Sequence, residues 1–145
     1  MSLTITQARD DMQSMLKAAI DASSYTDMKI VYQDTHNTPP PTIPVSGDVD
    51  PWLAVEIQHF TGGQTSLGPV ARYERRGQIR VSVYTEKGRG LSTSDEIAQI
   101  VLDAFEGESS AGGVWFRNCR IQEVGPDGAW SRVDVLIDFT YTQHK

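Results

Sequence analysis

The residues that could do chemistry are few and lie far apart in the sequence. The three histidines, His36, His59 and His144, fall in separate regions, and no spacing of Cys, His and carboxylate residues resembles a metal site. Cys119 is the single cysteine, so it has no internal disulfide partner; within a strand it is expected to be a small buried apolar residue. We therefore expect no metal, no cofactor and no catalytic residue, and folding in a reducing compartment.

Two glycine motifs have the spacing of phosphate loops but lack the required context. Residues 63–68 read G-x-x-x-x-G, yet Pro69 and Val70 follow where a phosphate loop has Lys and Ser or Thr. Residues 88–90, Gly-Arg-Gly, match a dinucleotide fingerprint only at its first two glycines, and a turn that ends a strand explains them. These residues favour a structural protein over an enzyme.

Charge is distributed unevenly along the chain. The 145 residues carry a net charge of −6, which disfavours general nucleic-acid binding. Residues 69–90 nevertheless carry +4, between flanks of −5 each. This basic island is either a solvated loop and strand edge or a patch that meets an acidic surface on another copy of the chain. Its members are Arg72, Arg75, Arg76, Arg80, Lys87 and Arg89.

Neither a membrane span nor a signal peptide is expected. No apolar run approaches the ~18 residues that a bilayer requires. The first residues lack a basic region followed by an apolar core.

Hydrophobic periodicity predicts two helices and five strands in the order α-β-β-β-α-β-β. Helical spacing covers residues 6–22 and 92–106, and alternation covers residues 28–33, 52–60, 78–85, 114–124 and 130–142. Strands that alternate apolar with polar residues suit a sheet covered on one face. We predict an α+β fold, a single domain over residues 1–145, with a mainly antiparallel sheet of about five strands and both helices on one face.

Several local features follow from this pattern. Thr4 or Thr6 should cap the first helix, with Asp10 and Asp11 near its positive end, and Ser92 or Thr93 should cap the second in a capping box with Asp95 or Glu96. Gly107 should end the second helix. A bulge should reconcile Phe116 with Cys119 and Ile121. Residues 61–69 and 125–128 read as a loop and a turn.

Side-chain environments are predicted in the same way. The final strand should turn Val133, Val135, Ile137, Phe139 and Tyr141 inward and Asp134, Asp138, Thr140 and Thr142 outward. Trp115, Phe116, Phe105 and Phe139 are most simply core residues. Trp52 either fastens the preceding loop to the core or contacts a partner, and we favour the first.

That preceding loop, residues 34–51, holds five of the seven prolines. Three of them are consecutive and favour an extended polyproline segment without internal hydrogen bonds. We interpret it as an exposed excursion from the domain, either mobile or docked on a partner. Pro39, Pro40 and Pro41 are accordingly candidate partner contacts.

The order and style of these stretches resemble the tail terminator (tail completion) proteins of tailed bacteriophages. The resemblance covers most of the chain. It is carried by P-W-L-A-V-E-I, by R-R-G-Q-I-R-V-S-V-Y-T with its Gly-rich turn, by S-D-E-I-A-Q-I-V-L-D-A-F, and by the closing R-V-D-V-L-I-D-F-T-Y.

The resemblance implies a virion protein of the tail, assembled in the cytoplasm of the host bacterium. It would form a homo-oligomeric ring, usually a hexamer, on the head-proximal end of the tail tube and stop tube polymerisation. Its partners would be the major tail tube protein and a head or neck connector protein. DNA would pass through the lumen only as cargo. No catalysis is implied, and the family has no motif of functional residues to transfer.

Two alternatives remain at this point. One is a small α+β enzyme or ligand-binding domain, which would need a pocket with convergent polar groups that the sequence does not offer. The other is a related head–tail connector or minor tail protein of similar fold.

Overall fold

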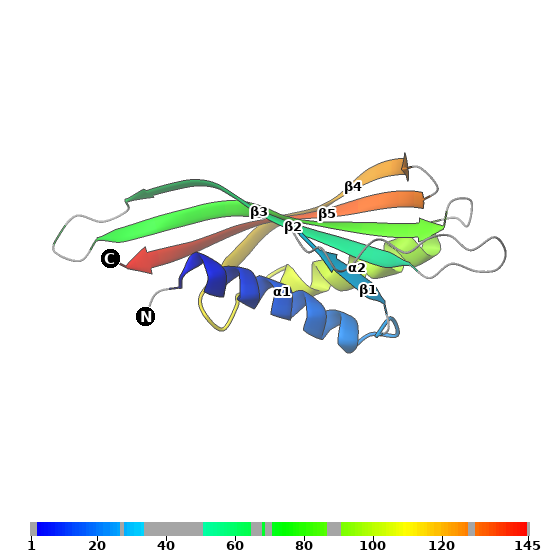
Figure 1. The fold of residues 1–145 in the computed structure, drawn as a ribbon, viewed down its shortest axis with the longest axis horizontal. Helices are drawn as coiled ribbons and strands as arrows, with labels where there is room; N and C mark the ends of the chain where they lie inside the picture. Colours follow the sequence, from blue (N-terminus) through cyan, green and yellow to red (C-terminus); the bar gives the residue numbers. More distant parts are fainter. Residues whose placement is uncertain are drawn as a thin grey trace.

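Two helices cover one face of a long, twisted five-stranded sheet (Figure 1). The computed structural model describes residues 3–26, 28–33, 51–64, 68, 71–86, 91–127 and 130–144. The elements are α1 (Ile5–Asp21), β1 (Lys29–Tyr32), β2 (Trp52–Gln64), β3 (Arg72–Glu86), α2 (Ser92–Phe105), β4 (Trp115–Asp127) and β5 (Trp130–His144). The α+β class and the order α-β-β-β-α-β-β are as predicted.

The strand order across the sheet is β1-β2-β3-β5-β4. β1 runs parallel to β2, and the other neighbours are antiparallel. β2, β3, β4 and β5 are longer than the sequence patterns predicted. Backbone pairing continues through polar stretches, such as Gln64 with Tyr73 and Arg72 with His144, because ladder hydrogen bonds do not require alternating apolar side chains. The first part of the predicted 61–69 loop is therefore strand.

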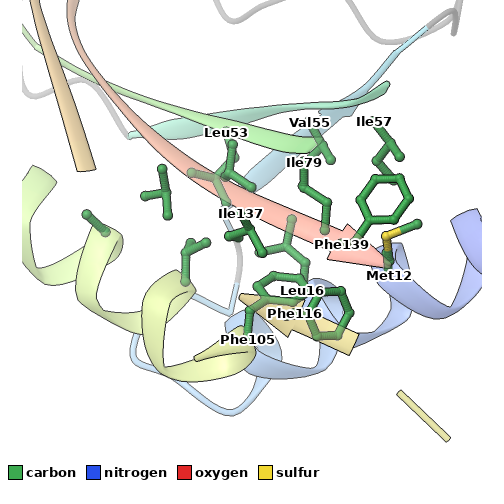
Figure 2. Close-up of a cluster of buried hydrophobic side chains, with 14 of the residues drawn as sticks. Met12, Leu16, Leu53, Val55, Ile57, Ile79, Phe105, Phe116, Ile137 and Phe139 are labelled. Atoms are coloured by element: carbon green, nitrogen blue, oxygen red, sulfur yellow. The ribbon is translucent and has the colours of Figure 1, made fainter. Parts of the chain in front are cut away.

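The core lies between the sheet and the helices. All five inward residues predicted for β5 are buried. They meet Met12 and Leu16 of α1 and Phe105 of α2, with Leu53, Val55, Ile57 and Ile79 from the neighbouring strands (Figure 2). Ile20 extends the buried stripe of α1.

Thr4 caps α1, as one of the two predicted alternatives. Its hydroxyl accepts from the Gln7 amide at 3.1 Å, and the Gln7 side chain accepts from the Thr4 amide at 3.0 Å. Asp10 and Asp11 lie beyond the first turn, so the predicted dipole role is wrong for them. Asp11 instead accepts from the Ser110 hydroxyl at 2.8 Å, which ties α1 to the segment before β4.

The predicted cap of α2 is wrong, whereas its predicted end is right. Leu91 is the N-cap residue, and no side chain provides a capping hydrogen bond. Leu91 already has helical dihedral angles, so Ser92 and Thr93 fall inside the first turn, where their hydroxyls are past the capping position. Gly107 follows the helix with φ of 73°, the left-handed conformation that glycine adopts at little cost.

β4 confirms the predicted bulge and corrects two other predictions. Its pairing with β5 shifts between Arg117 and Arg120, and Asn118 between them has φ of 57°. Trp115 is 67% exposed, so it is not a core residue. Pairing continues to Asp127, so most of the predicted 125–128 turn belongs to the strand.

Candidate interaction surface

The structure divides the basic island between the two faces of β3. Successive side chains of a strand point to opposite faces. Arg72, Arg76 and Arg80 therefore lie on the face away from the helices, which we call the open face. Arg75 points to the helix side. Arg72 and Arg80 are separated by about 26 Å along the strand. Lys87, Arg89, Pro39, Pro40 and Pro41 lie outside the described residues.

Arg75 is half-buried and held by its own domain. Its Nε donates to Oε1 of Gln143 at 2.9 Å, and its guanidinium carbon lies 5.9 Å from the centroid of the Tyr73 ring. The Arg75 side chain also occupies the space that a Cβ at Gly62 would need; Gly62 is the residue of β2 that pairs with Arg75. Arg75 is thus part of the packing between strands.

Arg80 belongs to a charge network at the middle of the open face. Asp134, predicted to face solvent, is only 2% exposed. Arg132 donates to both its carboxylate oxygens, at 2.8 and 2.9 Å, and Arg80 Nε lies 3.8 Å from Oδ2. The long arginine side chains cover the carboxylate, which is why an outward-facing residue is buried. The carboxylate of Asp134 thus offsets part of the positive charge of the two arginines.

Aromatic rings lie beside this network. Trp52 stacks on Tyr84 with ring centroids 4.1 Å apart. The rings of Trp52 and Trp130 meet in a T-shaped arrangement with centroids 5.9 Å apart. Trp52 therefore packs on the sheet itself; its predicted contact with the proline-rich loop lies outside the described residues. A shallow hollow of about 500 Å³ opens next to Glu56, Arg80 and Tyr84.

Two exposed aromatic residues mark another part of the open face. Phe60 is 59% exposed and Trp115 is 67% exposed. Phe60 sits at a bulge of β2, beside Thr61, which pairs with Arg76. Arg76 pairs with Thr140 of β5, and Thr140 pairs with Trp115. The two rings thus flank one row across four strands.

Two arginines lie between these rings. Arg117 donates to the Thr140 hydroxyl at 2.6 Å, and Arg76, whose side chain is 58% exposed, forms an ion pair with Glu74. A hollow of about 310 Å³ is lined by Phe60, Arg76 and Arg117, among others. We call Phe60, Arg76, Arg117 and Trp115 the aromatic–arginine row. Of this set only Arg76 was a candidate from the sequence, because the grouping depends on the pairing of strands: Trp115 and Arg117 pair regularly with β5, and Phe60 lies at the bulge of β2.

The outer face of α2 carries the opposite charge. Residues 92–108 contain five acids and no base. Asp95, Glu96, Asp103 and Glu106 are all exposed, and we call them the acidic α2 face. The hydroxyl of Tyr25 donates to Glu96 at 2.6 Å, a hydrogen bond that raises the pKa of Tyr25. α2 lies on the helix side of the sheet (Figure 1), whereas the aromatic–arginine row lies on the open face.

Of the two histidines within the described ranges, His59 contacts the core. Its Nε2 lies 2.8 Å from the Tyr141 hydroxyl, and its ring meets Phe139 edge-on at 5.1 Å. Burial lowers the pKa of His59, and the positive charges of Arg9 and Arg75 lower it further. A neutral imidazole that packs in this way is a structural residue.

The described residues contain no group of three or more His, Cys, Asp or Glu side chains that could hold a metal ion. Within the same ranges, neither helix has the length and apolar character needed to span a bilayer. The described residues present two chemically unlike surfaces, the aromatic–arginine row on the sheet and the acidic α2 face on the helix layer.

Comparison with known proteins identifies the family. The chain belongs to the phage tail terminator proteins, whose family model, described as "Phage tail terminator protein", matches residues 11–137. It is therefore a structural protein of the phage tail. No curated protein sequence matches it significantly.

Solved structures share the fold. One solved chain is 19% identical and aligns over 96% of both chains with a TM-score of 0.66. A chain from a structure titled "Virion of native gene transfer agent (GTA) particle" is 16% identical and aligns over 93% of this chain and 97% of that chain, with a TM-score of 0.57. At these identities the likeness concerns the fold alone.

Proposed function

We propose that this protein closes the head-proximal end of the tail tube as a ring of six copies, ends tube polymerisation and joins the tail to the head or neck. The family match over residues 11–137 is the observation that carries the proposal. The partners are further copies of the chain, the major tail tube protein and a head or neck connector protein. Assembly takes place in the host cytoplasm, and the product resides in the virion.

The chemistry of the two layers supports a closed ring. A ring needs a heterologous contact, in which two different patches of one subunit meet. The aromatic–arginine row and the acidic α2 face are unlike patches that point in different directions. The net charge of −6 also suits a lumen through which DNA passes without adhering.

The test is to polymerise the cognate tail tube protein with and without this protein and to examine the tubes by negative-stain microscopy. We expect a ring at one end of each tube and an arrest of elongation at that end. An unrelated protein of similar size and charge serves as the control. Tubes that keep growing, with no added density at either end, would overturn the proposal.

A further inference from the structure

We propose that the aromatic–arginine row of one copy docks on the acidic α2 face of the next copy. The inference rests on the proposed ring and names the surfaces that would hold it together. The row does not stand out in the sequence, because it is assembled from β2, β3 and β4 across the sheet.

The row has the composition of an interface centre. Trp and Arg are enriched among the residues that dominate binding energy in protein contacts, and Phe is enriched in interfaces. Phe60 and Trp115 are among the few large apolar side chains that the described residues leave exposed. Phe60 lies where a bulge disturbs the pairing of β2 with β3, and bulges commonly re-aim a side chain at functional surfaces. Trp115 pairs regularly with Thr140 and lies on the open face through the ordinary alternation of β4.

The charges of the two surfaces complement each other. Arg76 and Arg117 are the cations of the row, while the α2 segment from residue 92 to 108 has acids only. Arg76 contacts Glu74, but its guanidinium has five N–H donors and can also donate to a second carboxylate. A contact between the row and the α2 face would bring unlike charges together. A contact between two α2 faces, or between two rows, would bring like charges together and would be repulsive.

The spacing of the charges also agrees. Arg76 and Arg117 are two strands apart and offset by two residues along β5, which places their Cα atoms about 12 Å apart. Asp95 and Asp103 are separated by two helical turns, again about 12 Å. One arginine can therefore face each carboxylate.

A charge exchange tests the contact directly. In variant A, Arg76→Glu and Arg117→Glu make the row acidic; in variant B, Asp95→Arg and Asp103→Arg make the α2 face basic. Each variant alone would juxtapose like charges, so we expect its half-assembly concentration to rise roughly tenfold or more. A one-to-one mixture should assemble again, with A and B alternating around a ring of even number. The variant with all four substitutions should assemble by itself.

Analytical ultracentrifugation and native mass spectrometry measure these outcomes, and circular dichroism checks that each variant is folded. Lys17→Glu, which reverses an exposed charge on α1, is the charge control and should leave assembly unchanged. Trp115→Ala should weaken assembly, while Val124→Ala, at another exposed apolar position on β4, should not.

The results separate this contact from the proposed function. If the parent protein forms rings on tail tubes and variants A and B do so equally well, the docking is refuted and the function stands. The same holds if the mixture of A and B fails to assemble while both are folded. If the parent itself forms no ring on tubes, both proposals are overturned.

Discussion

Gly77 occupies a crowded backbone position on β3. It pairs with His59 on one side and with Phe139 on the other, and it is buried. The Phe139 ring lies over it, so that a Cβ at residue 77 would meet ring carbons Cζ and Cε1 at 2.5 and 2.8 Å and would also collide with the carbonyl oxygen of Gln58. Residue 77 does not have a positive φ angle, so the backbone conformation does not require glycine. The lack of space for a Cβ atom does.

Gly77→Ala should therefore destabilise the protein strongly. Overpacking a well-filled core typically costs 1–3 kcal/mol. The upper end, about 3 kcal/mol, applies because one of the obstructing atoms belongs to the backbone of β2 and cannot rotate away. For a protein of this size, that corresponds to a fall in the melting temperature of about 9 °C.

Gly63→Ala is the matched control in the same hairpin. A Cβ at residue 63 would meet nothing within 4 Å, and alanine restricts the unfolded chain, so this variant should be unchanged or about 0.5 kcal/mol more stable. Differential scanning calorimetry and urea unfolding measure both variants. A Gly77→Ala protein that melts within about 2 °C of the parent would refute the steric argument.

Three further predictions concern other contacts, and two of them have a control substitution. Thr4→Ala should cost about 1 kcal/mol in thermal unfolding because it removes the α1 cap, whereas Ser92→Ala, which removes no capping bond, should cost about a third of that or less; equal effects would contradict the assignment of the caps. Asp134→Ala leaves two arginines without their shared carboxylate and should cost about 2 kcal/mol in urea unfolding, less than for a fully buried pair because both arginines reach solvent. Asp21→Ala is the control, because it breaks only the exposed ion pair with Lys17. Its free energy of unfolding should stay within about 0.5 kcal/mol of that of the parent. Since burial holds the pKa of His59 below 6.5, the unfolded state binds this proton more readily; the associated stability is present above pH 6.5 and is lost as the pH falls through the folded-state pKa. His59→Gln should flatten the free energy of unfolding between about pH 7 and pH 5, and an unchanged slope would contradict this assignment.

Sequence periodicity predicted the helices and strands that bury one regular apolar face against the core. The inward side of β5 follows a strict repeat, and the structure buries its five residues accordingly. Gly107 was equally predictable, because a left-handed residue after a helix favours glycine. The family resemblance rested on these same regular stretches.

The candidate surface could be predicted only in part because it depends on pairing between strands. The proposed interface role of the basic island stays a prediction, but its geometry needed the register of β3: residues adjacent in sequence, such as Arg75 and Arg76, point to opposite faces. Trp115 was predicted to be buried because a tryptophan beside Phe116 reads as core. Asp134 shows the converse, since its burial comes from Arg132, two residues earlier on β5, and from Arg80 on β3, and the alternation of apolar and polar residues does not reveal such cover.

The position of β5 has a consequence for synthesis on the ribosome. β5 is the last described strand along the chain, yet it lies between β3 and β4, and it joins residues as distant in sequence as Ile79 and Ile137. Until residues 130–144 have been translated, β4 has no neighbour and one edge of β3 is unpaired. The nascent chain can form the β2–β3 hairpin early, but the sheet must wait for this late, non-local pairing. The row that needs Thr140 between β3 and β4 is therefore not assembled before β5 has been synthesised, and the proposed contact between copies can form only after that point.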